Sequence, residues 1–410
     1  MRTSRGPVLL ILCSTFMAAA GNGISMVAFP WLVLQRTGSA TEAAVVAGAA
    51  TLPLLFATLI AGTAVDFLGR RQVAMLADAM SALSVAAIPV LALTMGVGVL
   101  NTALLAGLAA LGAFFDPAGM TARLSMLPEA ARRADWTLDH TNSVYEAVFN
   151  LAYITGPGVG GLLIATLGGI STMWVTAAAF GLSILAIAVL RLSGADRPEP
   201  DERPEGVVSG VVEGLRFVWN NRVLRALGLL ELAVTGLYLP MESVLFPKYF
   251  SDRNQATHLG WVLMALSIGG LVGALSWTLL SRVASKRTTV LTAVATFGAA
   301  ATVIAFLPPL PLILVLSAVV GLVYGPIGPI YNSVMQTRTP EQMRGRVVGV
   351  MTSMAYAAGP VGFMIAGPLV DAFGLRFAFL ALALPVLVIA LLCPWVPAFR
   401  ELDADAPRMA

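Results

Sequence analysis

Apolar stretches long enough to cross a membrane follow one another along almost the whole chain, separated by short charged segments. A helix that spans a bilayer needs about 20 consecutive apolar residues. Four intervals of at least this length contain no charged residue: 6–35, 43–65, 347–370 and 377–399. Each of them predicts one transmembrane helix.

Three longer uncharged intervals hold two helices, or parts of two, because a cluster of Gly or Pro interrupts each one. Such clusters typically end helices. The intervals are 79–115, 147–190 and 288–337, with breaks at Gly96–Gly98 and Asn101, at Gly168-Gly169 and at Pro308–Pro311. With two further spans at 224–250 and 257–281, the pattern predicts twelve transmembrane helices.

The composition supports this interpretation and excludes most soluble proteins. Of the 410 residues, 58% are hydrophobic and 11% are charged, whereas soluble domains carry about 25% charged residues. So few charges would not solvate the surface of a soluble protein of this size. The chain is therefore expected to be an all-α integral protein of the cell membrane.

Positive charges predict the orientation of the helices. Arg2 and Arg5 precede the first apolar run, which is too long for the core of a signal peptide and is taken as the first span. With the N-terminus inside, 21 of the 25 Lys and Arg residues, Arg123 among them, fall on the cytoplasmic side. The positive-inside rule favours this topology, with both termini in the cytoplasm.

A charged segment divides the chain into two halves of six helices. Residues 193–205 mix charged residues with prolines, as in a solvated linker, and 207–219 have the spacing of an interfacial amphipathic helix. The predicted division is 1–191 for the first bundle, 192–222 for the linker, 223–398 for the second bundle and 399–410 for a cytoplasmic tail.

The two halves repeat short motifs in the same order. Phe115-Asp116-Pro117-Ala118-Gly119 returns as Tyr324-Gly325-Pro326-Ile327-Gly328, Leu127-Pro128-Glu129 as Thr339-Pro340-Glu341, and Gly156-Pro157 as Gly359-Pro360. Two six-helix halves related in this way are a known transporter plan, in which substrate binds between them near the midplane. We therefore expect two pseudo-symmetric six-helix bundles.

The loop after the second span carries the clearest local motif, Gly62-Thr63-Ala64-Val65-Asp66-Phe67-Leu68-Gly69-Arg70-Arg71. Gly62 allows close helix approach, Gly69 permits a tight turn, and Asp66 at the membrane edge needs a cation or a helix N-terminus. The motif resembles the G-x-x-x-D-x-x-G-R-[RK] pattern of the major facilitator superfamily. That resemblance implies the major facilitator fold.

The same resemblance implies a cytoplasmic gate. In similar transporters an acid in the fourth helix joins the loop Asp and Arg in a charge cluster, a role that we carry over to Asp66, Arg70 and Asp116. Arg71 belongs to the same gate motif and helps to hold the loop in the cytoplasm. The corresponding loop of the second half starts at Gly273 but has Trp277 where the acid would stand. The expected gate is therefore asymmetric.

The fifth span contains a second motif, Gly156-Pro157-Gly158-Val159-Gly160-Gly161. It resembles the G-P-x-x-G-G core of exporters that exchange substrate for protons, although Ala152 replaces an upstream glycine of that motif. Glycines permit close helix packing and Pro157 bends the helix. An arginine found in the fourth helix of many proton antiporters is absent from 107–116.

Further passages resemble one branch of the superfamily, the Tap-type multidrug efflux pumps of actinobacteria. They include Phe29-Pro30-Trp31-Leu32-Val33, Pro240-Met241-Glu242-Ser243 and Arg344-Gly345-Arg346-Val347-Val348-Gly349-Val350. The resemblance implies export of drugs such as tetracycline and aminoglycosides, driven by the proton gradient without a cofactor. It implies small-molecule and proton partners, no nucleic acid, and a monomer in the bilayer.

Acids within the spans need a reason, because a charge at mid-membrane costs about 2.5–3.5 kcal/mol on insertion scales. Glu231 and Glu242 are eleven residues apart, so both project from one face of the seventh helix. We expect that face to meet a central cavity and one or both of the two to take up the coupling proton, with Glu242 the better candidate. Polar residues that are candidates for lining the cavity are Asn22, Tyr238, Tyr324, Tyr331 and Asn332.

Other functions on the same composition remain open. A metabolite or siderophore exporter and a nutrient importer would use the same fold. A membrane-embedded enzyme is disfavoured because no H-E-x-x-H, G-x-S-x-G or paired metal-ligand array occurs. Asp78 and Glu146 lie near helix starts, where acids commonly compensate the helix dipole.

Overall fold

The computed structural model describes residues 5–192, 207–281, 283–340 and 343–403. Within these ranges, nothing is described of the side chains of residues 59, 62, 63, 66, 67, 139, 154, 207–211, 278, 279, 336, 344 and 345. Twelve helices in the described ranges are long and apolar enough to cross a membrane, and no strand occurs there. The predicted all-α membrane fold is confirmed.

The chain divides into two compact units. The first comprises 1–203 with 250–260, and the second comprises 204–249 with 261–410. The helices of the first unit are α1 Gly6–Thr37, α2 Ala40–Leu68, α3 Arg70–Met95, α4 Thr102–Ala134, α5 Leu138–Leu167 and α6 Gly169–Val189, with the 3₁₀ turn η1 Val97–Val99 after α3. The predicted linker residues 193–206 lie outside the described ranges.

The second unit contains an amphipathic helix followed by the remaining spans. Its helices are α7 Val207–Asn220, α8 Arg222–Pro240, α11 Lys286–Ile304, α12 Leu310–Tyr324, α13 Ile327–Arg338, α14 Arg344–Phe373 and α15 Leu375–Leu392. Short turns complete it: the π-helix η2 Met241–Leu245, the 3₁₀ turn η4 Cys393–Trp395 and α16 Pro397–Arg400. The boundary between the units falls within α9 Phe246–Ser251 and again within α10 Ala256–Leu280.

The helix breaks fall where Gly, Pro and capping residues predicted them. At Gly69 and Gly168 the backbone φ is 88° and 83°, a conformation that favours glycine, so one helix ends and the next begins without a loop. Asn101 begins α4 by accepting a hydrogen bond from the backbone N–H of Leu104 at 2.9 Å. These signals are local, which is why the sequence alone located them.

The helices pair in the same order in both units. In the first unit α1 packs on α5, α2 on α4 and α3 on α6. In the second unit α8 packs on α14 and α11 on α15, while Gly269 of α10 lies against Ala318 of α12. This agreement confirms the pseudo-symmetry that the repeated motifs predicted.

Two interruptions distinguish the second unit from the first. In the first unit α4 continues through Pro117, whereas at the matching position Gly325-Pro326 separates α12 from α13. The predicted seventh span is also not a uniform α-helix, because five residues after Pro240 form the π-helix η2. Proline lacks a backbone donor, and π turns occur often at functional positions.

One end of each unit is held by a pair of arginines that donate to backbone carbonyls. In the first unit Arg71 donates to Ala188 O, and Arg133 donates to Arg191 O at 2.6 Å. In the second unit Arg287 donates to Pro394 O at 3.1 Å, and Arg338 donates to Glu401 O. Each pair joins the start of the third helix and the end of the fourth to the end of the last transmembrane helix or to the chain after it.

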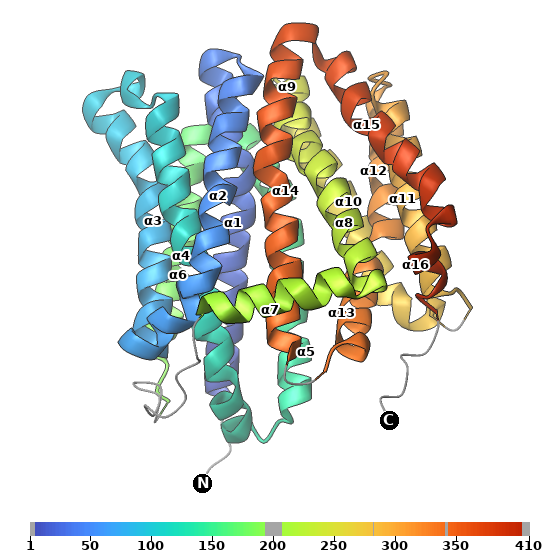
Figure 1. Cartoon of the computed structure of the whole chain (residues 1–410). Coiled ribbons are helices and arrows are strands. Elements are labelled where there is room, and N and C mark those ends of the chain that lie inside the picture. Colours follow the sequence, from blue (N-terminus) through green and yellow to red (C-terminus); the bar gives the residue numbers. More distant parts are fainter. Residues whose placement is uncertain (1–4, 193–206, 282, 341–342, 404–410) are drawn as a thin grey trace. The chain divides into compact units, whose positions relative to one another are not determined.

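The amphipathic helix α7 belongs to the second unit and crosses α14 near the end where α14 begins (Figure 1). Gly214 is the crossing point, since a methyl group there would lie 3.0 Å from Arg346 O. Beside it, Glu213 and Arg346 form an exposed ion pair. The helix α7 covers the residues 207–219 for which an amphipathic helix was predicted, and its place at the membrane interface stays a prediction.

Candidate functional site

A buried ion pair inside the first unit is the strongest polar feature of the described chain. Arg123 of α4 contacts both carboxylate oxygens of Asp78 of α3 at 3.0 Å, and the two side chains are 7% and 3% exposed. Ser183 of α6 donates to Asp78 Oδ2 at 2.6 Å, and its Oγ lies 2.7 Å from Ser14 Oγ of α1. Four helices therefore meet at this pair.

Both charged residues differ from their predicted positions. Arg123 is not in a cytoplasmic loop, because α4 extends unbroken to Ala134. Asp78 does not compensate a helix N-terminus, because it lies more than two turns into α3 and faces Arg123. The segment 107–116 of the fourth helix lacks the arginine that many proton antiporters carry there. The same helix nevertheless contains an arginine, Arg123, seven residues after Asp116.

Asp116 of α4 is not part of this ion pair and has hydrogen-bonding partners of its own. Ser81 of α3 donates to Asp116 Oδ1 at 3.1 Å, and Asn22 of α1 is a second hydrogen-bonding partner. The predicted contact between Asp116 and Arg70 is not formed, because Arg70 starts α3 eleven residues before Ser81, about 16 Å along the helix axis. Asn22, predicted to line a cavity, is thus a partner of Asp116.

The loop motif forms a direct junction between α2 and α3. Gly69 makes the turn, and Arg71 reaches the end of α6. The side chains of Gly62 and Asp66 lie outside the described part of the structure, so their predicted contacts stay predictions.

The helix 5 motif forms the contact between α5 and α1. A methyl group at Gly156 would lie 2.8 Å from Gly23 Cα, and one at Gly160 would lie 3.1 Å from Ile24 Cα. Pro157 is buried beside Gly23, and α5 runs through it without a break. Gly161 faces Gly260 of the segment 250–260, which belongs to the same unit.

Glu242 lines a small apolar pocket inside the second unit. The pocket has a volume of about 30 Å³ and is formed by η2, α8, α9, α10, α11, α12 and α15. Its walls include Phe297, Phe379 and Tyr238, and Tyr238 is the hydrogen-bonding partner of Glu242. The residues around Glu242 thus all belong to one unit, whereas the sequence predicted a cavity between the halves.

Glu231 lies about 16 Å from Glu242 along the same span, in a different polar group. Thr235 donates to Glu231 Oε1 at 3.2 Å. Tyr331 of α13 also lies against Glu231, and its hydroxyl donates to Leu227 O at 3.0 Å. Tyr324 is close enough for an electrostatic interaction with Glu231. Asn332, in contrast, is exposed.

The arrangement combines a buried arginine neutralised by its acid, the half-buried Asp116, Glu231 among hydroxyl groups and Glu242 in an apolar pocket, all on membrane-spanning segments. No group of three or more His, Cys, Asp or Glu residues in the described chain has the geometry to hold a metal ion. Such isolated carboxyls in transmembrane helices mark substrate or proton pathways in transporters.

Comparison with protein families agrees with this fold. The model of the Major Facilitator Superfamily matches residues 11–363 and again 243–405. The chain belongs to the Major Facilitator Superfamily. It is therefore a membrane transporter and not an enzyme, as predicted from its motifs.

Individual members of the superfamily are similar over the full length. The chain is 68% identical to the multidrug efflux pump Tap of Mycolicibacterium fortuitum over 401 residues, 98% of each chain. It is 64% identical to the multidrug efflux pump Tap of Mycobacterium tuberculosis (strain ATCC 25618 / H37Rv) over 404 residues, 98% of this chain and 96% of the relative. The predicted resemblance to Tap-type exporters is confirmed.

Solved structures of the superfamily share the fold at low identity. The nucleoside transporter NupG has a TM-score of 0.72 at 14% identity, covering 98% of this chain and 99% of its own. A D-xylose-proton symporter has a TM-score of 0.73 at 11% identity, covering 96% and 98%. At these identities the likeness concerns the fold alone.

Proposed function

We propose that this transporter exports drugs by alternating access and couples export to the inward movement of protons. The observation that carries the proposal is the 68% identity, over 98% of both chains, to a pump named for multidrug efflux. The cargo then includes tetracycline and aminoglycosides, as the Tap-type motifs imply.

Proton coupling requires a carboxyl group that gains and loses a proton during the cycle. Glu242 meets this requirement, because it lies on a membrane-spanning helix in a pocket walled by aromatic and aliphatic side chains. No basic residue of the described chain forms an ion pair with it. The pocket volume of about 30 Å³ is enough for one or two water molecules, which would carry the proton.

Asp116 and Glu231 are the other candidates for this role. Because Asp78 neutralises Arg123, the side-chain partners of Asp116 are the uncharged Ser81 and Asn22. Glu231 has the hydroxyl groups of Thr235 and Tyr331 as neighbours. Both residues therefore have surroundings that tolerate the protonated form as well as the charged one.

The decisive experiment measures uphill drug transport in inverted membrane vesicles energised by a proton gradient. Glu242→Gln should bind the drug, lose the pH dependence of transport and fail to accumulate drug against a gradient. The matched control is Glu213→Gln, which removes an acid from the exposed ion pair of α7. If Glu242→Gln still transports drug uphill while Asp116→Asn or Glu231→Gln does not, the coupling role belongs to Asp116 or Glu231, whichever substitution abolishes uphill transport.

The same vesicles separate drug export from the alternatives. The enterobactin exporter EntS of Escherichia coli O1:K1 / APEC is 28% identical over 262 residues, 62% of this chain and 60% of that protein. This partial similarity favours a siderophore as the second candidate cargo. Proton-driven uptake of a siderophore into inverted vesicles, with no uptake of any drug, would replace drug export by siderophore export. Accumulation in right-side-out vesicles instead would indicate an importer.

We further propose that Asp66, Arg70 and Arg71 act in a cytoplasmic gate. Asp66→Asn should insert normally and impair transport, and normal efflux at normal expression would exclude the gate.

Pro157 is proposed to keep α5 bent and mobile, so Pro157→Leu should lower turnover more than drug affinity. A collapse of affinity at normal turnover per bound drug would make α5 a binding element.

A further inference from the structure

A buried hydroxyl group of the second unit has two acceptors within reach and one proton to donate. Tyr331 of α13 is 8% exposed, and its hydroxyl donates to Leu227 O of α8 at 3.0 Å. The carboxyl group of Glu231, one turn further along α8, is its second hydrogen-bonding neighbour. A tyrosine hydroxyl carries a single proton, so it cannot donate to both groups at once. While Tyr331 donates to Leu227 O, it offers Glu231 only the lone pairs of its oxygen.

The surroundings of Glu231 contain hydroxyl groups and no counter-charge among the described residues. Thr235 donates to Glu231 Oε1 at 3.2 Å, and Tyr324 of α12 is the other titratable group that interacts with this carboxyl. Cys393 of η4 lies near Tyr331 on its other side. The elements α7, η2, α14, α15 and α16 also pack on α8, but none of their described residues brings a charged group to Glu231.

The protonation state of Glu231 therefore decides which acceptor the Tyr331 hydroxyl uses. A protonated Glu231 can donate to the Tyr331 oxygen while Tyr331 donates to Leu227 O, so two hydrogen bonds join α13 to α8. An ionised Glu231 can only accept, and a hydrogen bond to a carboxylate is roughly twice as strong as one between neutral groups. The Tyr331 proton then turns to the carboxylate, and one bond replaces two. Leu227 O keeps the backbone N–H of Glu231 as its donor within α8.

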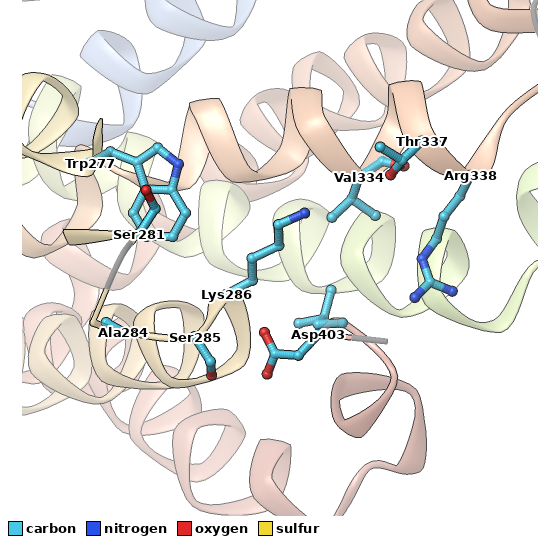
Figure 2. A pocket seen from close by; sticks show the side chains of 10 residues that line it. Trp277, Ser281, Ala284, Ser285, Lys286, Val334, Thr337, Arg338 and Asp403 are labelled. Atoms are coloured by element: carbon cyan, nitrogen blue, oxygen red, sulfur yellow. The ribbon is translucent and has the colours of Figure 1, made fainter. Parts of the chain in front are cut away.

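The helix that carries Tyr331 is a short segment that can respond to this change. It follows Gly325-Pro326, where the proline has no N–H to donate and the helical hydrogen bonds between α12 and α13 are interrupted. Near its other end, Lys286 of α11 donates to Ser333 Oγ at 3.1 Å. Figure 2 shows Lys286 and Asp403 facing the side of α13 that carries Val334. A shift of α13 would thus reach the start of α11 and the chain after α16.

We propose that Tyr331 is a positioning residue that reports the protonation state of Glu231 to α13. With Glu231 protonated, two hydrogen bonds hold α13 on α8. With Glu231 ionised, one remains, and α13 opens more readily at the end of the second unit where α11 begins. This inference rests on the proposed function in one respect, namely that export is coupled to protons and that Glu231 is among the acids that take them up. It adds the step by which such a proton changes the packing of a helix.

Hydrogen–deuterium exchange of the purified full-length transporter, in detergent and without cargo, tests the proposal. Exchange in peptides of α13 is measured from about pH 4 to about pH 9, the range over which carboxyl groups in proteins titrate, and is divided by the intrinsic rate of unfolded amides. The wild type should exchange roughly fivefold faster at the high end, the factor that corresponds to one typical hydrogen bond. Glu231→Gln, whose amide still donates, should exchange slowly at every pH, and Tyr331→Phe should exchange fast at every pH.

Two matched variants separate this hydrogen bond from its surroundings. Tyr324→Phe removes the other tyrosine hydroxyl that interacts with Glu231, and Glu242→Gln removes the other acid of the same span. Both variants should keep the wild-type dependence of α13 exchange on pH. Loss of the dependence in either one would assign the response to that residue and would overturn the proposal.

The remaining outcomes are equally decisive. Exchange of α13 that does not change with pH in the wild type, or that keeps its change in Tyr331→Phe, contradicts the role of Tyr331. If Tyr331→Phe does not fold, Glu231→Gln still decides, because a pH-dependent α13 in that variant excludes Glu231 as the titrating group. No cargo and no proton gradient are present, so a failure of drug export or of coupling through Glu242 would leave these results unchanged.

Discussion

In each of the two units, an arginine at the start of the third helix and another at the end of the fourth donate to backbone carbonyls at the end of the last transmembrane helix or in the chain after it. Arg71 and Arg133 do this in the first unit, and Arg287 and Arg338 in the second. The polar residues inside the two units differ. The first unit buries an arginine with its acid, while in the second unit the half-buried Glu242 lies among aromatic side chains.

From this difference we expect the two units, whose helices pair in the same order, to have different roles. A paired buried charge keeps its charge and fixes the geometry of the helices around it. Glu242 has the hydroxyl of Tyr238 as its described partner, and in the proposed coupling role it changes its protonation state during the cycle. The first unit is then expected to be the rigid partner, and the second, interrupted at Gly325-Pro326 and after Pro240, the one that adapts.

The largest expected effect comes from breaking the buried pair of the first unit. Arg123→Gln leaves Asp78 buried without a counter-charge, which typically destabilises a protein by about 3–5 kcal/mol. Thermal unfolding of the purified variant in detergent should show this loss. The double variant Asp78→Asn with Arg123→Gln should recover much of it, because no unpaired charge remains. Wild-type stability of the single variant would contradict a structural role for the pair.

The next effect concerns the close crossing of α1 and α5. A side chain at Gly156 would collide with the backbone of Gly23, so Gly156→Val should destabilise the protein by about 2 kcal/mol or more and lower transport. The control lies in α14, the counterpart of α5, where no atom lies within 4 Å of a methyl group built on Gly349. Gly349→Ala should be neutral or stabilising by up to about 1 kcal/mol. Equal effects at both positions would show that the crossing is not tight.

The comparison also shows which features sequence reasoning recovers. The helix ends at Gly69, Asn101 and Gly168 were predictable, because capping and positive φ depend on one or two neighbouring residues. The pseudo-symmetry of the two halves was predictable from the repeated motifs. Both kinds of signal are contained in short stretches of the chain.

The polar contacts of the interior were not predictable in the same way. Asp78 and Arg123 are 45 residues apart, and only the packing of α3 on α4 brings them together. Because Arg123 was assigned to a loop, its pairing with Asp78 was not predicted. The apolar pattern around Arg123 was also compatible with a helix that continues through Pro117 and Pro128, as the structure has it. The pocket of Glu242 likewise needs six other elements to be in position.

A smaller effect is expected where the units are alike. Arg71→Gln and Arg287→Gln each remove an arginine contact to the end of the last helix, worth about 1 kcal/mol for a partly exposed hydrogen bond. If the two contacts are equivalent, the two losses of unfolding free energy should agree within about 0.5 kcal/mol, measured under identical detergent conditions. A several-fold difference between the two losses would show that contacts of the same geometry contribute unequally to the free energy of unfolding.

The smallest effect is expected at the exposed ion pair between Glu213 and Arg346. The two side chains are 58% and 47% exposed, so water and salt screen the pair, and Arg346→Gln should cost less than about 0.5 kcal/mol. The attachment of α7 to α14 instead depends on the backbone contact at Gly214, so Gly214→Leu should destabilise the second unit more than the loss of the ion pair. Thermal unfolding of both variants at low and high salt checks this order. If Arg346→Gln were as damaging as Arg123→Gln, burial would not explain the difference between the two ion pairs, and the rigidity assigned to the first unit would lose its physical basis.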